Sequence, residues 1–238
     1  MIKGFGILSF LLFLILCAQI GTFGPGFAVW FLSALMVISG TVSSVFFFLP
    51  AALEKGGLQH LKSFSYYQPL ALVDTIHEIA EQVRKDGLLS IESIRQDIKD
   101  SWLQYALKKM VEGFDQNSIL PVIRNEGIRS AELFTMLEQF KERVSSAIPL
   151  FGLAGSLSHL MFFLSKNDQS LVAASFVPFL FSVLLQVVFS MWIQSQIDFL
   201  SDRSRIYHVV LEEGIAGIQS GIHADLLKDQ LVARINHV

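Results

Sequence analysis

Small and polar residues interrupt an apolar stretch of this chain at a helical spacing. The segment 147–164 reads AIPLFGLAGSLSHLMFFL and carries Pro149, Gly152, Gly155, Ser156 and His159. The last four share one face of a helix, because residues three and four apart are helical neighbours. Small residues let helices approach closely in lipid, where the hydrophobic effect cannot drive association. A plain lipid anchor needs no such face, so this segment is expected to contact another helix.

The apolar segment that follows carries a matching polar stripe: Ser175, Ser182, Gln186, Ser190 and Gln194. The two faces are either contacts that hold helices together or the lining of a water-accessible path, and the two interpretations overlap. Neither segment contains Asp, Glu, Lys or Arg, whereas proton and sodium relays normally use intramembrane carboxylates. If the chain conducts ions, another polypeptide must supply that acid. His159 is the one titratable candidate of the chain itself, and a buried neutral histidine is the simpler interpretation.

Other motifs that could carry chemistry are incomplete. The stretch HEIAE (77–81) resembles half of a zinc-protease helix but lacks the second histidine, so a charged face of an amphipathic helix is the better interpretation. There is no phosphate-binding loop, no dinucleotide glycine pattern and no cluster of Cys and His. The sequence therefore predicts no enzyme, no catalytic residue, no metal site and no cofactor.

Charge distribution predicts the elements that position these residues. Of the 238 residues, 52% are hydrophobic and 16% are charged, and no charge occurs between Lys3 and Glu54, in 144–165 or in 169–197. A spanning helix takes about 20 residues, so the first gap, broken by GTFGPG, holds two spans. We predict an all-α membrane protein with four spans near 5–22, 27–50, 146–165 and 171–197. The domain boundaries expected are 1–53 (spans one and two), 54–143 (cytoplasmic helices), 144–198 (spans three and four) and 199–238 (cytoplasmic tail).

Basic residues predict the orientation, because cytoplasmic loops are rich in Lys and Arg. The loop 54–143 holds twelve of them and the tail after Asp198 holds four, so both termini and this loop should be cytoplasmic. The first span has the pattern of a signal peptide, but a second span follows at once and we expect it to be retained. The net charge of −3 argues against a nucleic-acid partner, and the single cysteine predicts no disulfide.

The polar loop and the tail are expected to be helical. The segment 70–83 places Leu72, Val73, Ile76, Ile79, Ala80 and Val83 on one face. A second helix is predicted over 88–113, and a third from near Asn117 without a break into the third span. The tail should form a helix over 204–222 and a shorter one after it.

Four segments resemble the MotA/PomA family of flagellar stator subunits, part of the wider MotA/TolQ/ExbB group, and they occur in the family order over nearly the whole chain. They are ALMVISGTVSSVFFFLP (34–50), RKDGLLSIE (84–92), IPLFGLAGSLSHL (148–160) and EGIAGIQSGIHADLLKDQL (213–231). The resemblance implies a bacterial inner-membrane homopentamer around a MotB-like single-span partner with a membrane aspartate. It implies conduction of H⁺ or Na⁺ along spans three and four, torque on a FliG-like rotor switch protein, and a role in motility and chemotaxis. It also implies rotor-facing charges at Arg84 and Glu92 and a hinge at Pro149. Together with the two helix faces, we predict an ion path and partner contact at Pro149, Gly152, Gly155, Ser156, His159, Pro178, Ser182 and Gln186.

The sequence departs from the family within the ion path. Pro178–Phe179 stands where the family has a Thr-Thr pair in span four. Trp192 stands where the family has its second functional proline, and His159 stands where it has a glycine. We expect Pro178 to kink span four in compensation. Two alternatives stay open: a TolQ/ExbB-type energiser of an envelope machine, and a MotA-like structural ring that does not conduct.

Overall fold

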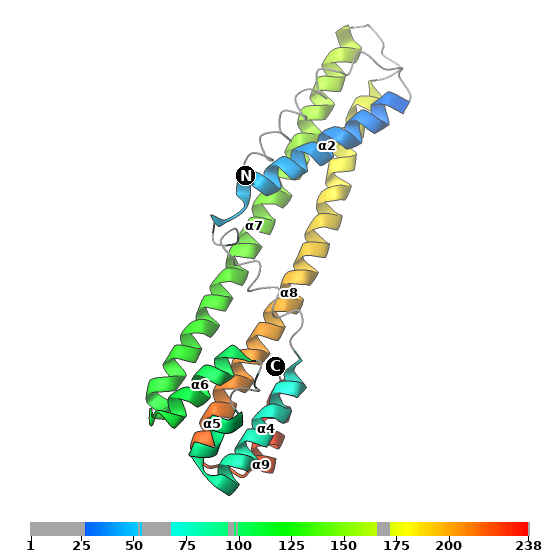
Figure 1. Ribbon diagram of the computed structural model, residues 1–238. Coiled ribbons are helices and arrows are strands. Elements are labelled where there is room, and N and C mark those ends of the chain that lie inside the picture. The colour runs from blue at the N-terminus through cyan, green and yellow to red at the C-terminus, as the bar shows by residue number, and fades with distance from the viewer. Residues whose placement is uncertain are drawn as a thin grey trace. The chain divides into compact units, whose positions relative to one another are not determined.

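The described part of the chain consists of helices joined by turns and loops. The computed structural model describes residues 27–51, 53, 68–94, 98, 100–165 and 172–237, and within these ranges it contains helices and no strand (Figure 1). The predicted all-α fold is confirmed. The first predicted span, near 5–22, lies outside the described residues. The chain divides into two compact units, one of 1–55 and 135–197 and one of 56–134 and 198–238.

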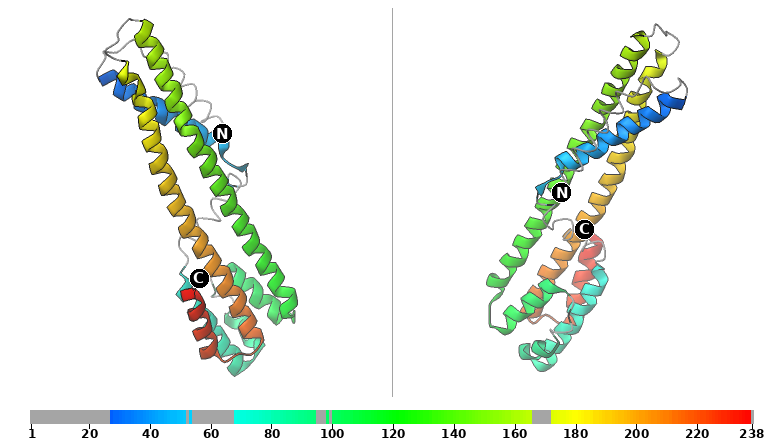
Figure 2. Two further views of the ribbon diagram at one scale, coloured as in Figure 1. Left: turned by 180° about the vertical axis from the view of Figure 1, so that it is seen from behind. Right: turned by 45° about the horizontal axis from the view of Figure 1, so that its top comes forward.

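The first unit contains the apolar helices. They are α2 (Phe27–Phe48), the later part of α7 (Gln116–Ser165), the short 3₁₀ helix η5 (Ala173–Phe176) and the first part of α8 (Val177–Gln219). Three helices of the described chain, α2, α7 and α8, are long and apolar enough to cross a membrane, and they coincide with three of the four predicted spans. α2 crosses α7 and α8 within this unit (Figure 2).

Burial in the first unit differs from that in a water-soluble protein, although a small apolar cluster of Val37, Val144 and Ile148 is buried there. Large apolar side chains such as Leu157, Met161, Leu184 and Met191 are exposed, while the buried polar residues are Ser33, Ser39, Ser43, Ser44, Ser145, Ser156, Ser175, Ser182 and His159. Several of these hydroxyls donate to a carbonyl of their own helix, as Ser39 does to Met36 at 3.0 Å. This distribution is typical of a membrane protein, in which small and polar residues gather where helices meet and apolar residues face the lipid.

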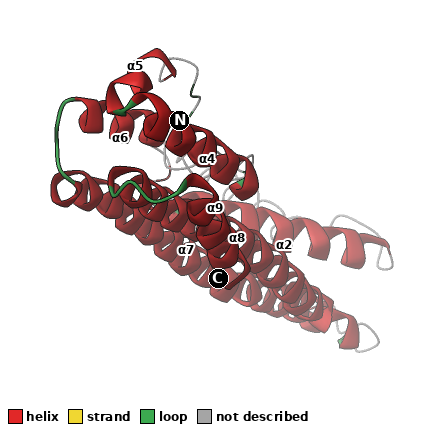
Figure 3. Ribbon diagram, turned by 90° about the horizontal axis from the view of Figure 1, so that it is seen from below, coloured by secondary structure: helices red, strands yellow, loops and turns green. Residues whose placement is uncertain are grey.

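The second unit has an ordinary amphipathic organisation. α4 (Pro69–Asp86) begins with proline in its first turn and ends at Gly87, whose φ of 80° is left-handed and favours glycine. Its buried face is the predicted one without Val83: Leu72, Val73, Ile76, Ile79 and Ala80. α9 (Ala224–His237) lies beside α4 (Figure 3). The core also contains Leu103, Leu107, Leu211 and Ile215, all fully buried.

The single helix predicted over 88–113 is wrong. The structure has a 3₁₀ turn η2 (Leu88–Ser90), a short α5 (Ile91–Ile94) and a separate α6 (Ser101–Val111). α6 starts afresh because Asp100 has an extended backbone and its carboxylate accepts hydrogen bonds from the N–H groups of Trp102 and Leu103. The same carboxylate accepts the Tyr207 hydroxyl of α8 at 2.9 Å, so this helix start is also a tertiary contact.

Two long helices pass through both units. α7 runs unbroken from Gln116 to Ser165, which confirms the predicted continuous helix into the third span. α8 runs from Val177 to Gln219, so the tail helix predicted as a separate element over 204–222 is the continuation of the fourth span. Pro178 lies in the first turn of α8, where proline is tolerated. The predicted kink within span four is therefore wrong.

Candidate functional site

Gly152 lies where α7 and α8 approach each other closely. A Cβ atom built on Gly152 would lie 2.0 Å from Ser182 Oγ and 2.8 Å from the Pro178 carbonyl oxygen. Real Cβ atoms do not come so near, so the two helices touch here only because residue 152 has no side chain. The two helix faces predicted from sequence spacing do meet at this crossing.

Gly155 and Ser156 extend the same crossing by one helical turn. A Cβ on Gly155 would lie 3.2 Å from Pro178 Cβ and 3.5 Å from Met36 Sδ of α2, so three helices converge on it. Ser156 Oγ accepts a hydrogen bond of 3.1 Å from the backbone N–H of Phe179. That N–H lies in the first turn of α8, where helix donors commonly lack a carbonyl partner of their own helix.

A second close approach joins α2 to α7. A Cβ on Gly40 would fall 2.3 Å from the ring of Phe151, and the Thr41 hydroxyl donates to the Val37 carbonyl at 2.7 Å. The site residues predicted from sequence omit Gly40 and Phe151. The Gly-Thr pair in the family-like segment 34–50 was the available signal for the glycine, but nothing in the sequence pairs it with Phe151.

His159 is completely buried on the same face of α7, one turn beyond Gly155. Its ring centroid lies 6.0 Å from that of Phe163, and neither ring nitrogen has a hydrogen-bond partner among the described residues. Pro149 and Gln186 are half-buried and make no described contact with the Gly152–Ser182 crossing. The structure thus brings together five of the eight predicted path residues: Gly152, Gly155, Ser156, Pro178 and Ser182.

The two predicted rotor-facing charges lie on either side of one turn in the second unit. Arg84 lies in the last turn of α4 and Glu92 lies in α5, and both side chains are exposed. Neither belongs to an ion pair within the described part of the chain. The turn between them contains Gly87 and η2.

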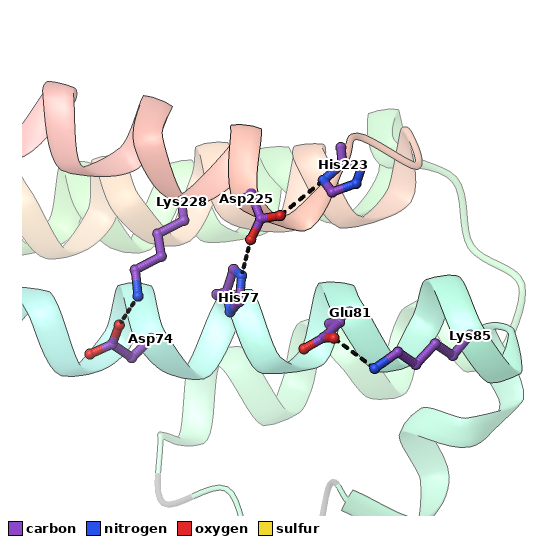
Figure 4. Close-up of polar contacts among 7 residues, drawn as sticks. All are labelled: Asp74, His77, Glu81, Lys85, His223, Asp225 and Lys228. Atoms are coloured by element: carbon purple, nitrogen blue, oxygen red, sulfur yellow. Dashed lines mark hydrogen bonds and ion pairs between the residues drawn. The ribbon is translucent and has the colours of Figure 1, made fainter.

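Ion pairs that the sequence did not predict join α4 to α9 (Figure 4). Asp74 pairs with Lys228 at 2.7 Å, and His77 Nε2 lies 3.0 Å from Asp225, whose other oxygen is 3.5 Å from His223 Nδ1. The hydrogen bond with His77 holds the pKa of Asp225 below its usual value. His77, the histidine of HEIAE, thus takes part in the contact between α4 and α9.

Two glycines of α8 explain the glycine-rich tail segment. A Cβ on Gly214 would lie 2.5 Å from Ile76 of α4, and one on Gly217 would lie 2.3 Å from Leu227 of α9. α8 therefore accepts an apolar side chain from each neighbouring helix where a glycine leaves room. In both units, therefore, a glycine without a side chain lets a neighbouring helix come close.

The chain has relatives of known sequence over most of its length. No known protein-family model matches the chain. Among curated relatives, the uncharacterized protein YtxD of Bacillus subtilis is 27% identical over 209 residues, covering 84% of this chain and 76% of that protein. Motility protein A of Treponema phagedenis is 23% identical over 248 residues, covering 93% and 94%.

Two solved structures share the fold. The structure of C. jejuni MotAB matches with a TM-score of 0.74 and 20% sequence identity, covering 95% of this chain and 93% of that one. The flagellar MotAB stator complex of Bacillus subtilis matches with a TM-score of 0.72 and 19% identity, covering 94% and 93%.

Proposed function

We infer that this chain, a divergent member of the MotA/PomA family, is a stator subunit of an ion-driven flagellar motor in the bacterial inner membrane. The relatives with a stated role are motility proteins, and the chain is not an enzyme. The observation that carries the proposal is the crossing of α7 and α8 at Gly152 and Ser182. It lies in the two helices that the family resemblance assigns to the ion path.

The proposed mechanism needs a partner that supplies an acid. No Asp, Glu, Lys or Arg occurs in the described parts of the three apolar stretches, 27–51, 144–165 and 172–197. A chain that conducts H⁺ or Na⁺ through such helices would depend on a carboxylate from elsewhere. We assign it to a MotB-like single-span protein, around which five copies of this chain form a ring with their termini in the cytoplasm. The names of the two solved complexes, both MotAB, support such a partner.

Each half of the chain then has a part in producing torque. Protonation or ion binding at the partner's aspartate would alter how the partner's span contacts α7 and α8. Pro149 of α7 would take part, because the N–H that proline lacks loosens the helix backbone there. The resulting movement of the ring would reach the rotor through Arg84 and Glu92. The side chains of α7 and α8 make and break no covalent bond in this scheme. The flow of ions alone supplies the energy that turns the ring.

The experiment that tests this function begins with the full chain, tagged and purified in mild detergent. We expect an intact complex whose mass fits five copies with two copies of a single-span, aspartate-bearing protein. Reconstituted in vesicles, the complex should carry an H⁺ or Na⁺ current that replacement of the partner's aspartate by asparagine abolishes. A ring of this chain alone, without a carboxylate-bearing partner and without current, would contradict the proposal.

A further inference from the structure

His159 of α7 is a titratable side chain that the structure buries without a partner. Its exposed fraction is 0%, and neither Nδ1 nor Nε2 has a hydrogen-bond partner among the described residues. Its ring is tilted by 38° to the ring of Phe163, and the two centroids are 6.0 Å apart. Buried polar side chains of native proteins nearly always have a hydrogen-bond partner, so a histidine without one calls for an explanation.

No described charge is available to stabilise a protonated His159. The described residues of α2, of α7 from Val144 onward and of α8 as far as Ile197 contain no Asp, Glu, Lys, Arg, Cys or Tyr and no second histidine. The nearest charged residues in the sequence are Arg143 and Lys166, which lie outside these stretches. Burial of an unpaired charge is strongly unfavourable. The packed helices therefore accept the imidazole ring in its neutral form.

His159 lies beside the convergence of three helices. It follows Gly155 by one helical turn, and at Gly155 both Met36 of α2 and Pro178 of α8 come close to α7. α7 ends at Ser165, so His159 is about 9 Å from that end at the rise of an α-helix. In the proposed topology this end of α7 faces the outside of the cell.

A proton can bind to this imidazole ring only when the helices move apart. In an open form, with water around the ring, His159 would take up a proton as a free histidine does, at roughly pH 6.5. Open and packed forms then differ by one bound proton, so the equilibrium constant for opening rises about tenfold for each pH unit below that value. The hydrogen bond from the Phe179 N–H to the Ser156 hydroxyl lies one turn away on α7 and would break on opening.

We propose that His159 binds a proton from outside the cell and that this proton opens the packing of α2, α7 and α8, which lowers ion conduction in acid. The proton acts as an inhibitor and is not carried across the membrane. The effect on conduction rests on the proposed stator function. The opening itself depends only on the packing of this chain.

The first test measures hydrogen exchange of the Phe179 amide in the full chain, purified in mild detergent. Protection relative to an unstructured chain at the same pH should fall about tenfold for each pH unit below roughly pH 6.5. His159→Phe keeps a ring and cannot be protonated, so its protection should stay constant down to about pH 5. His159→Gln, a neutral polar replacement, should behave in the same way and serves as the second variant if phenylalanine disturbs folding.

His208→Gln is the matched control for this exchange experiment. His208 is a half-buried histidine in the second unit, and its Nδ1 lies 2.7 Å from the Ser204 carbonyl oxygen. The variant should keep the pH dependence of the unmodified chain at Phe179. If His159→Phe and His159→Gln also keep that dependence, or if the unmodified chain shows none, the proposal is overturned.

The second test measures ion current through the complex with its partner in vesicles, at fixed voltage and with equal pH on both sides. At about pH 5 the unmodified chain should carry less than about half the current of His159→Phe, and at about pH 7.5 the two should be equal. Equal currents at both pH values would overturn the effect on conduction and leave the stator function standing. A complex that carries no current at any pH would contradict the stator function, while exchange at Phe179 would still decide whether His159 opens the packing.

Discussion

The two units of this protein differ in what they bury besides apolar side chains and in what they expose. The first unit, which contains the apolar helices, has a small apolar cluster of Val37, Val144 and Ile148 but also buries many serines and a histidine and exposes many large apolar side chains. The second unit buries mostly leucine and isoleucine and places its ion pairs outside. In lipid an apolar surface costs nothing, so close approach and hydrogen bonding must hold the helices together. In water, apolar burial supplies the stability and surface ion pairs add little. Four substitutions test this contrast, and we take them from the largest expected effect to the smallest.

Ile76→Ala in the second unit should give the largest loss. Ile76 is fully buried and lies against Gly214 of α8, so its truncation leaves a cavity that the helices cannot close. We expect a loss of about 3 kcal/mol in the free energy of unfolding, measured by denaturant unfolding of the purified complex. Leu70→Ala is the control, since Leu70 is exposed at the start of the same helix, and it should change stability by less than about 0.5 kcal/mol. Equal losses for both variants would show that this unit does not depend on apolar burial.

Gly152→Val in the membrane unit should destabilise by adding atoms. The new side chain would overlap Ser182 and the Pro178 carbonyl, and overpacking costs about 2 kcal/mol. Thermal unfolding in detergent should show a lower midpoint, and the complex with the partner should be recovered in lower yield. Leu153→Val, next in sequence but with an exposed side chain, should behave like the unmodified chain. An unchanged midpoint for Gly152→Val would mean that α7 and α8 do not touch at this point.

Ser156→Ala should have a smaller effect of about 1 kcal/mol, typical of one hydrogen bond between membrane helices. The substitution leaves the Phe179 N–H without its acceptor. Hydrogen exchange at Phe179 should accelerate while exchange in α2 stays unchanged. Ser158→Ala serves as the control, because the Ser158 hydroxyl donates only to the Ala154 carbonyl of its own helix at 2.9 Å. If both variants exchange alike at Phe179, the hydroxyl contact contributes nothing.

Acid should weaken the α4–α9 contact by the smallest amount. The pKa of Asp225 is lowered in the folded chain, first by its hydrogen bond with His77. Its stabilising contribution is therefore present above the unfolded-state value of 3.8 and is lost as the pH falls through the lower folded-state pKa. Protection of the α9 amides against hydrogen exchange, relative to an unstructured chain at the same pH, should fall below about pH 4, and Asp225→Asn should remove that part of the pH dependence. A pH dependence that survives this substitution would assign the acid sensitivity to another carboxylate.

Sequence periodicity predicted most helices and the small face of α7, because both depend on residues three and four apart. It placed Gly152, Gly155 and Ser156 on one face, and the structure shows that face against Pro178 and Ser182. Periodicity could not predict contacts between segments that are far apart in the sequence. The pair of His77 and Asp225 joins residues 148 positions apart, and no local pattern encodes which helix meets which.

The errors have local causes. Over 88–113 the apolar residues keep a helical spacing, which predicted one helix. Asp100 nevertheless caps the start of a separate helix, α6, and this local hydrogen bonding determines where the helix begins. At the end of span four the change from apolar to charged residues suggested a boundary, but the backbone of α8 continues through it, because a helix needs no break where its surroundings change.

The hydrogen bond between Phe179 and Ser156 has a consequence for how the protein enters the membrane. An N–H at the start of a spanning helix cannot be left without an acceptor in hydrocarbon, and here the acceptor belongs to the preceding apolar helix. The contact with α7 therefore satisfies a donor that α8 alone would leave without an acceptor, so pairing of α8 with α7 lowers the cost of placing the start of α8 in lipid.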